Sequence, residues 1–210
     1  MTFDVALAKR LMAAADRLIQ EKKDYLTELD STVGDGDLGL TMSEGFAKAA
    51  EYAAGSPETD VGRFFVRIGM TFAQAVPSSM GTLMASAFMK AGKAVTGKEA
   101  LQAAELADFC AGLADGIMER GKCQPGGRTI VDAVYPAAAA AKEAAQAQED
   151  LGVIARKAYQ AALDGVEATR EMEPTIGKAL YHKDKAKGLP DQGAVVGSLF
   201  YQCLCETLSE

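Results

Sequence analysis

Apolar side chains recur at helical spacing in one segment of this sequence after another, and no segment alternates apolar and polar residues as a strand would. In the first segment Leu7, Leu11 and Leu18 share one face, with charged residues between them. Because the period of the apolar residues decides which secondary structure can bury them together, this pattern restricts the chain to helices. Alanine is abundant and Trp is absent, which suits closely packed helices better than a β-sandwich. The sequence therefore predicts seven or eight helices in a single all-α domain over residues 1–210.

Glycine, proline and aspartate mark the breaks between the predicted helices. Helices are expected over residues 4–29 and 41–54, from about 60 to a break at 77–81, from that break to about 97, in a segment that ends before 121, and over 129–147, 150–173 and 193–208. In an up-and-down arrangement of helices, alternate loops lie at the same end. We therefore expect residues 30–40, 77–81, 121–128 and 178–193 to meet on one rim.

The charge pattern and the absence of long apolar runs exclude several classes of protein. The formal net charge is −7, and no stripe of Lys and Arg could neutralise a nucleic-acid backbone. No apolar run approaches the roughly 20 residues of a membrane span, and the first residues are unlike a signal peptide. The four cysteines form no C-x-x-C pair and the only histidine is His182, so a zinc site is not expected. These features predict a cytoplasmic protein with reduced cysteines that binds neither nucleic acid nor membrane.

The strongest local motif is L-D-S-T-V-G-D-G-D-L-G at residues 29–39, in which glycines separate three carboxylates. Asp30, Asp35 and Asp37 would repel one another in a single loop unless a hard cation neutralised them. Mg²⁺ prefers such oxygen ligands and usually keeps positions for phosphate oxygens and water. The motif predicts a magnesium site at these three aspartates. The alternative is a solvated turn in which the carboxylates only cap the backbone.

A second motif, P-S-S-M-G-T at residues 77–82, consists of small residues that lead into a predicted helix. The first N–H groups of that helix could face an anion. An N-cap at Ser78 or Ser79 explains the same residues, and the sequence leaves both interpretations open.

Two later segments carry cationic side chains. Residues 119–129 combine glycines with Arg128 and Thr129, which could meet a phosphate at the start of a helix. This segment lacks the order of a Walker A loop, and a plain connection between helices explains it equally well. In the long break after residue 173, Lys178 could close over phosphates as a mobile cation, or simply be solvated.

Taken together and in this order, the motifs are similar to those of the L subunit (nucleotide-binding subunit) of dihydroxyacetone kinases. The resemblance covers nearly the whole chain, from the first predicted helix to the last. The matching motifs are the aspartate motif at residues 29–39, G-F at 45–46, R-G-K-x-x-P-G at 120–126, R-T-x-x-D at 128–132, G-K-A-x-Y at 177–181 and D-x-G-A at 191–194.

The resemblance implies a closed barrel of about eight antiparallel helices, with a nucleotide and two Mg²⁺ ions at one end. It implies that Asp30, Asp35 and Asp37 ligate the magnesium, and that the nucleotide is tightly bound ADP or ATP. Lys178 and Arg128 are the candidate catalytic residues, because phosphoryl transfer depends mainly on positioning and charge neutralisation. The residues expected to line the nucleotide are Leu38, Gly39, Leu40, Thr41, Ser79, Met80, Gly121, Thr129, Ile130, Lys178, Asp191, Gln192 and Gly193.

In this family a K subunit holds the ketose covalently through its own histidine, and the L subunit delivers the phosphoryl group. The resemblance therefore implies a kinase that acts with a K subunit on a small ketose, either dihydroxyacetone or a tetrulose. The phosphoryl donor is either ATP or a phosphotransferase-system protein that recharges bound ADP. The chain departs from the family pattern at Leu38, where His is common, at Lys178, where Arg is usual, and at Gln192, where Pro is usual.

Two hypotheses from other classes compete with the kinase subunit. One is a non-catalytic, ADP-dependent regulatory protein, in which the bound nucleotide shapes a surface for a partner. The other is a helical bundle with a structural divalent-metal site. A kinase subunit would turn over with its ketose-binding partner, a regulator would bind nucleotide without turnover, and a structural metal protein would bind no nucleotide.

Overall fold

The computed structural model describes residues 2–209 and confirms the all-α prediction. Within these residues there are nine α-helices, two 3₁₀ helices and two strands of two residues each. The α-helices are α1 (Val5–Val33), α2 (Leu38–Gly55), α3 (Val61–Ala75), α4 (Ser79–Ala94), α5 (Ala103–Gly121), α6 (Val131–Gln146), α7 (Leu151–Ala168), α8 (Lys183–Ala186) and α9 (Gln192–Ser209); the 3₁₀ helices are η1 (Thr169–Glu171) and η2 (Lys178–His182), and the strands are β1 (Phe3–Asp4) and β2 (Ala100–Leu101). None of the helices in this part of the chain is both long and apolar enough to cross a membrane.

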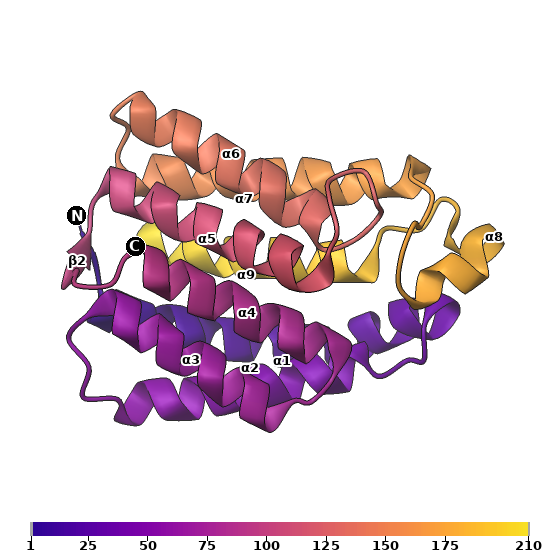
Figure 1. Cartoon of the computed structure of the whole chain (residues 1–210), viewed down its shortest axis with the longest axis horizontal. Helices are drawn as coiled ribbons and strands as arrows, with labels where there is room; N and C mark the ends of the chain where they lie inside the picture. Colours follow the sequence, from indigo (N-terminus) through magenta and orange to yellow (C-terminus); the bar gives the residue numbers. More distant parts are fainter. Residues whose placement is uncertain (1, 210) are drawn as a thin grey trace.

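The long helices run roughly along the long axis of the molecule, and the short helix α8 lies at one end (Figure 1). From α1 to α7 each helix packs against the next one in the chain, and α9 packs against both α7 and α1. Because most connections are short, consecutive helices run in opposite directions. The long helices thus form a ring of contacts, in which the last one, α9, packs against the first one, α1.

Aromatic rings from different helices meet in the core. Phe65 of α3 lies 4.5 Å from Phe109 of α5 and 6.2 Å from Phe88 of α4, measured between ring centroids. Phe88 in turn lies 5.4 Å from Phe200 of α9. All four rings are buried, and α9 is buried on nearly every side, which explains why its sequence is apolar all round. Removal of this surface from water is the main force that holds the helices together.

Strands β1 and β2 correct the expectation that the chain has no strand. They are antiparallel and pair Phe3 with Leu101 and Asp4 with Ala100. Two residues are too few to produce an alternating pattern in the sequence, so periodicity could not reveal them. The pairing joins the start of α1 to the start of α5 at the end of the molecule opposite α8 (Figure 1).

At the β1–β2 end the helices begin with carboxylate caps. Asp4, Asp60 and Asp150 are the N-cap residues of α1, α3 and α7, and each side chain accepts a hydrogen bond from the backbone N–H three residues later. Helix α5 begins with a capping box, in which the Glu105 carboxylate accepts from the backbone N–H of Gln102. These caps satisfy N–H groups that the first turn of a helix leaves free.

The boundaries around the aspartate motif differ from the predicted ones. Helix α1 continues past Asp30, and α2 begins earlier than expected, so only residues 34–37 form the loop. The hydroxyl groups of Ser31 and Thr32 donate to carbonyls one turn back, a bond that these side chains can make within a helix. Asp30 therefore lies on a helix end rather than in a loop.

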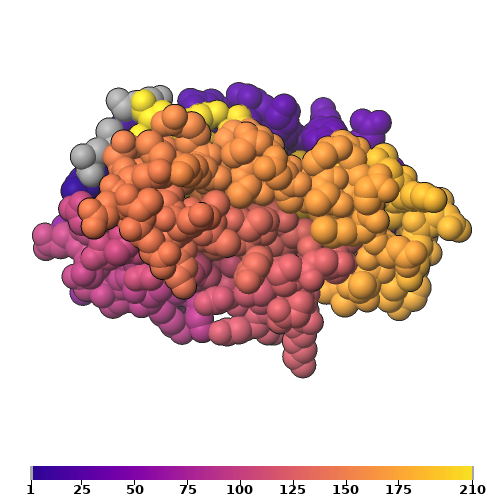
Figure 2. Space-filling model, turned by 90° about the horizontal axis from the view of Figure 1, so that it is seen from above, coloured from indigo at the N-terminus to yellow at the C-terminus, as the bar shows by residue number. Residues whose placement is uncertain are grey.

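The segment after α7 contains more regular structure than predicted. Helix α7 ends at Ala168 rather than near residue 173, and η2 and α8 lie within residues 174–192, which were expected to be irregular. The backbone N–H of Gly188 donates to the carbonyl of Arg170, which draws the two ends of the segment together. Figure 2 shows this segment in gold at one end of the molecule.

Candidate functional site

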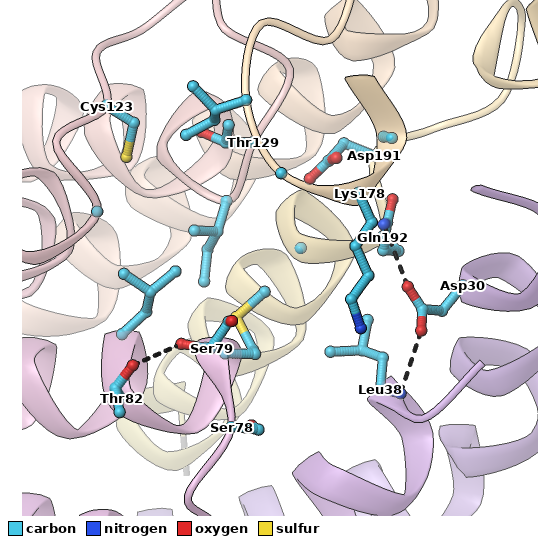
Figure 3. A pocket seen from close by; sticks show the side chains of 18 of the residues that line it. Asp30, Leu38, Ser78, Ser79, Thr82, Cys123, Thr129, Lys178, Asp191 and Gln192 are labelled. Atoms are coloured by element: carbon cyan, nitrogen blue, oxygen red, sulfur yellow. Dashed lines mark hydrogen bonds between the residues drawn. The ribbon is translucent and has the colours of Figure 1, made fainter. Parts of the chain in front are cut away.

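A cavity of about 780 Å³ lies between the loops near α8. Residues within 30–38, 77–83, 120–130 and 176–193 line it (Figure 3). These segments overlap the four breaks that the sequence predicted to meet on one rim, and the structure confirms that the four breaks meet. The volume lies within the range of small-molecule sites, about 300–1,000 Å³.

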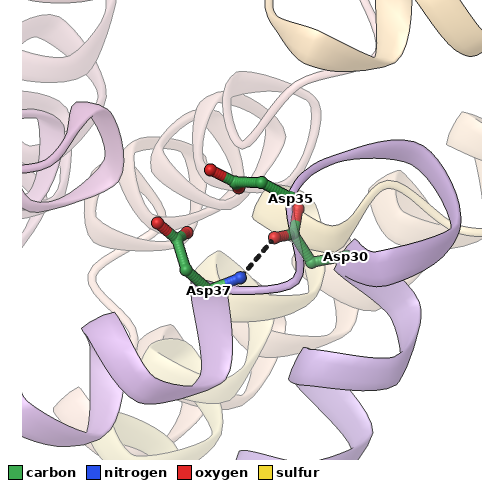
Figure 4. A group of neighbouring side chains, drawn as sticks. All are labelled: Asp30, Asp35 and Asp37. Carbon is green, nitrogen blue, oxygen red and sulfur yellow. Dashed lines mark hydrogen bonds between the residues drawn. The ribbon is translucent and has the colours of Figure 1, made fainter.

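Asp30, Asp35 and Asp37 lie together on one wall of the cavity. One carboxylate oxygen from each lies within 4.8 Å of the other two. Figure 4 shows Asp35 and Asp37 projecting from the loop to the same side, next to Asp30. Asp30 is buried, whereas Asp35 and Asp37 are exposed. Three hard oxygen donors within this distance fit a divalent cation such as Mg²⁺.

Asp30 both shapes the loop and faces the cluster. Its Oδ2 accepts from the backbone N–H groups of residues 36–38, at 2.9, 3.1 and 3.4 Å. A Cβ at Gly34 would overlap Oδ1 of Asp30, so the loop requires glycine at this position. The backbone-capping role that the sequence left open therefore applies to Oδ2 of Asp30, while the carboxylate as a whole also belongs to the acidic cluster.

A lysine neutralises part of the charge of this cluster. Lys178 donates a hydrogen bond to Asp35 in a close ion pair, which lowers the pKa of Asp35 and raises the pKa of Lys178. Partial burial raises the pKa of Asp37, and the charge of Asp35 adds to this effect. Three carboxylates thus share one ammonium group, and the excess negative charge favours a further cation.

Helices α2, α4, α6 and α9 all begin at the cavity. Ser78 is the N-cap of α4, since its Oγ accepts from the backbone N–H of Gly81 at 3.0 Å. Ser79 and Met80, the first residues of α4, line the cavity. The segment therefore both caps the helix and presents the start of the helix to the cavity, so the two interpretations of this motif are compatible. The N-cap residues of α2 and α6 make no side-chain cap bond, although Asp30 accepts from the first N–H of α2 and Thr129 from the first N–H of α6. Free N–H groups and the positive ends of the helix dipoles make this wall suitable for an anion.

Asp132 shapes the second glycine-rich loop. Its carboxylate oxygens accept from the backbone N–H groups of Gly126 and Thr129 at 2.5 and 2.7 Å. Gly126 has φ of +91°, a conformation that glycine adopts without steric cost. Because Asp132 is buried, these bonds hold Thr129 and Ile130 in place on the cavity wall.

The structure gives Arg128 different partners from the predicted phosphate. Its side chain is 0% exposed, and Nη2 donates to the carbonyls of Ala186, Leu189 and Pro190 at 3.1, 3.0 and 3.5 Å. Its Nη1 lies 3.6 Å from Oδ2 of Asp191. Burial lowers the pKa of Arg128, and the charge of Asp191 opposes this effect. Nη2 therefore holds the segment before α9, while Nε and Nη1 have no hydrogen-bond partner among the described residues and Arg128 still lines the cavity. Contact of Arg128 with a phosphate stays a prediction, beside the positioning role that its hydrogen bonds indicate.

Asp191 connects that segment to α9. Its Oδ1 accepts from the backbone N–H of Ala194 at 2.8 Å and so caps the helix. Its own backbone N–H donates to Oγ1 of Thr169 at 2.8 Å. Burial raises the pKa of Asp191 to about 7, although Ala194 and the charge of Arg128 oppose this shift.

Most residues predicted to line a nucleotide do line the cavity: Leu38, Ser79, Met80, Gly121, Thr129, Ile130, Lys178, Asp191, Gln192 and Gly193. The structure does not bring Gly39, Leu40 and Thr41 to it. Because α2 already begins at Leu38, the next residues turn onto other faces of the helix. Gly39 packs against α1, where a Cβ would overlap the carbonyl oxygen of Lys23, while Leu40 is exposed and Thr41 is buried.

Several cavity residues were not among the predicted ones: Pro77, Ser78, Thr82, Leu83, Arg120, Cys123, Ile176, Gly177 and Ala179. Thr82 and Leu83 lie one turn after Ser79 and Met80 on α4, so helical periodicity could have found them. Ile176 belongs to a segment without a periodic pattern, and no signal in the sequence indicated it.

Sequence comparisons find relatives along the whole chain. The family model of the DAK2 domain matches residues 32–206. The chain is 30% identical over 207 residues to the PEP-dependent dihydroxyacetone kinase 1, ADP-binding subunit DhaL, of Listeria innocua, with 99% of this chain and 98% of that one covered. It is 28% identical over 193 residues to the PEP-dependent dihydroxyacetone kinase, ADP-binding subunit DhaL, of Escherichia coli, with 92% of each covered.

A solved structure shares the fold. The crystal structure of the dihydroxyacetone kinase from C. freundii in complex with AMP-PNP and Mg²⁺ matches 98% of this chain with a TM-score of 0.71 and 25% identity. The present chain spans 34% of the length of that protein, so it corresponds to about a third of it.

Proposed function

We propose that this chain, which belongs to the DAK2 domain family, is the nucleotide- and magnesium-binding subunit of a dihydroxyacetone-type kinase. The observation that carries the proposal is the placement of Asp30, Asp35 and Asp37 on one wall of a cavity to which four helix N-termini also point. A divalent cation fits the acidic wall and a phosphate fits the helix starts, so the cavity suits a magnesium polyphosphate.

The proposed unit is a single domain over residues 1–210 that forms a closed barrel of eight antiparallel helices. The contacts of α9 with both α7 and α1 support closure of the barrel. The short connections between consecutive long helices support the antiparallel order.

Asp30, Asp35 and Asp37 are the proposed ligands of two Mg²⁺ ions, and the nucleotide is ADP or ATP. When bound, magnesium would neutralise negative charge on the phosphate oxygens. Ser79 and Met80 at the start of α4 and Thr129 and Ile130 at the start of α6 would hold the nucleotide from the other side, and the lining residues Leu38, Gly121, Asp191, Gln192 and Gly193 would complete the site.

Lys178 is the proposed catalytic residue, because its ammonium group already lies beside the acidic cluster and can neutralise charge on a phosphate there. Arg128 acts as a positioning residue, since its hydrogen bonds hold the segment that follows Lys178. The only histidine, His182, is exposed, so the chain relies on positioning and charge neutralisation rather than on a base of its own.

The proposed partner is a K subunit that holds a small ketose, either dihydroxyacetone or a tetrulose. The donor would be ATP or a phosphotransferase-system protein that recharges bound ADP; the two relatives described as PEP-dependent favour the second. The proposed location is the cytoplasm, and neither nucleic acid nor membrane is a proposed partner.

Native mass spectrometry for copurified ADP, followed by calorimetric titration of ADP with and without Mg²⁺, tests the proposal. Asp35→Asn is expected to weaken magnesium-dependent ADP binding by at least about tenfold, because it removes one charged ligand, while the helical circular dichroism stays unchanged. Asp24→Asn, which alters an exposed carboxylate on α1, is the matched control and should bind ADP like the wild type.

ADP affinity of Asp35→Asn equal to that of the wild type would refute the metal assignment. Magnesium-dependent ADP binding without turnover alongside a K subunit would favour the regulatory protein instead.

A further inference from the structure

The side chain of Gln192 reaches from the first residue of α9 to Asp30 at the end of α1 (Figure 3). Its Nε2 donates to Oδ1 of Asp30 at 3.2 Å. This bond joins α1 and α9, the first and last long helices, and it lies at the acidic cluster. We propose that Gln192 is a positioning residue for the cation site, which holds the orientation of the Asp30 carboxylate beside the other two. The inference rests on the proposed function.

The two oxygens of Asp30 have separate tasks. Three backbone N–H groups occupy Oδ2, so Oδ1 is the oxygen that Asp30 can offer to a cation. The bond from Gln192 is the side-chain contact that fixes the direction of Oδ1. A carboxylate oxygen can accept one hydrogen bond and still bind a cation, so the two roles are compatible.

The other end of the Gln192 amide also points to a ligand. Its Oε1 is buried and, among the described residues, has no hydrogen-bond partner. A buried acceptor without a partner is unfavourable, so this oxygen gains from a donor that arrives with the ligand, such as a water molecule on the cation. Gln192 lines the cavity in which that donor would bind.

The helix itself does not require glutamine at this position. Asp191 caps α9 through bonds to Ala194 and Val195, which do not involve Gln192. The first position of a helix accepts proline, because the N–H of that residue has no partner within the helix. A role in starting α9 therefore cannot explain the amide, whereas its bond to Asp30 can.

The test measures Mn²⁺ binding by electron paramagnetic resonance in the presence of ADP, with Mn²⁺ as the spectroscopic substitute for Mg²⁺. Gln192→Leu keeps the size of the side chain, and Gln192→Pro keeps the helix start. Both are expected to raise the Kd for Mn²⁺ about tenfold or more, the usual effect of losing a residue that orients a metal ligand.

Gln202→Leu is the matched control, since Gln202 lies on the same helix, about 15 Å further along its axis than Gln192, and donates to Glu206 at 2.9 Å. It should bind Mn²⁺ like the wild type, and an equal loss in this variant would overturn the proposal.

Unchanged Mn²⁺ affinity in Gln192→Pro, alongside normal binding by the wild type, would overturn the inference and leave the proposed function intact. If the wild-type chain binds neither Mn²⁺ nor ADP, the proposed function fails and the inference fails with it.

Discussion

Replacing Arg128 by methionine should mainly lower the free energy of unfolding of the protein, rather than its affinity for a nucleotide. The guanidinium is the donor for the carbonyls of Ala186, Leu189 and Pro190 and the counter-charge of Asp191. Methionine fills much of the same volume but supplies neither a donor nor a charge. Breaking a buried pair by removing one partner costs about 3–5 kcal/mol.

The penalty should depend on pH, because Asp191 can respond to the loss of its partner. Without Arg128 the pKa of the buried Asp191 carboxyl rises further, so protonation removes the unpaired charge at lower pH. We therefore expect a loss of about 3 kcal/mol at pH 8 and a smaller loss at pH 6. A domain of ordinary stability, about 5–15 kcal/mol, survives such a loss.

Urea unfolding followed by circular dichroism measures this free energy. Arg128→Lys keeps the charge but loses the planar geometry, so it should lie between the wild type and Arg128→Met. The double variant Arg128→Met with Asp191→Asn should lose less than the sum of the single variants, because neither partner is then left charged and alone. Wild-type stability in Arg128→Met together with a large loss of ADP affinity would refute this reasoning and restore the phosphate contact that the sequence first indicated.

Two further predictions concern packing and pH. Gly39→Ala should lower the free energy of unfolding in urea by about 1–3 kcal/mol, since the new Cβ would overlap the carbonyl of Lys23. Gly55→Ala is the control and should lower it by less than about 0.5 kcal/mol, because no described atom lies within 4 Å of a Cβ there. Equal effects of the two substitutions would contradict the packing assigned to Gly39. Burial raises the pKa of Asp191 from 3.8 to about 7, so between these pH values the native state keeps a proton that the unfolded chain releases. The free energy of unfolding should therefore fall as pH rises from about 4 to about 7, by at most about 1.4 kcal/mol per pH unit. Asp191→Asn should remove this contribution, and identical pH slopes for both proteins between pH 5 and 8 would show that the carboxyl does not titrate as stated.

The sequence predicted the features that depend on local pattern. The spacing of Leu7, Leu11 and Leu18 indicated α1 because a helix gathers such residues on one face. Glycines between Asp30, Asp35 and Asp37 indicated the acidic cluster, because carboxylates so close in the chain have few ways to separate. The meeting of four loops followed from the alternation of direction in an up-and-down array.

The features that depend on distant contacts could not be predicted in this way. The direction of the Arg128 side chain depends on carbonyls about 60 residues later in the chain, which no local pattern specifies. The bond between Gln192 and Asp30 joins residues separated by 162 positions. Asp30 lies within α1 although Ser31 and Thr32, which follow it, are of residue types that occur in turns and caps as well as in helices.

The carboxylate caps at the β1–β2 end have a consequence for where an anion can bind. In an antiparallel array half of the helices begin at each end, so the backbone alone gives both ends the same electrical polarity. Asp4, Asp60 and Asp150 occupy N–H groups at one end and add negative charge there, which repels a phosphate. At the other end Ser78 caps α4 with a neutral hydroxyl, and the N-cap residues of α2 and α6 make no side-chain cap bond. The carboxylates of Asp30 and Asp191 also accept backbone N–H groups at this end. The carboxylate caps thus disfavour an anion at the β1–β2 end, whereas the acidic cluster at the other end can bind a cation and accept an anion together with it.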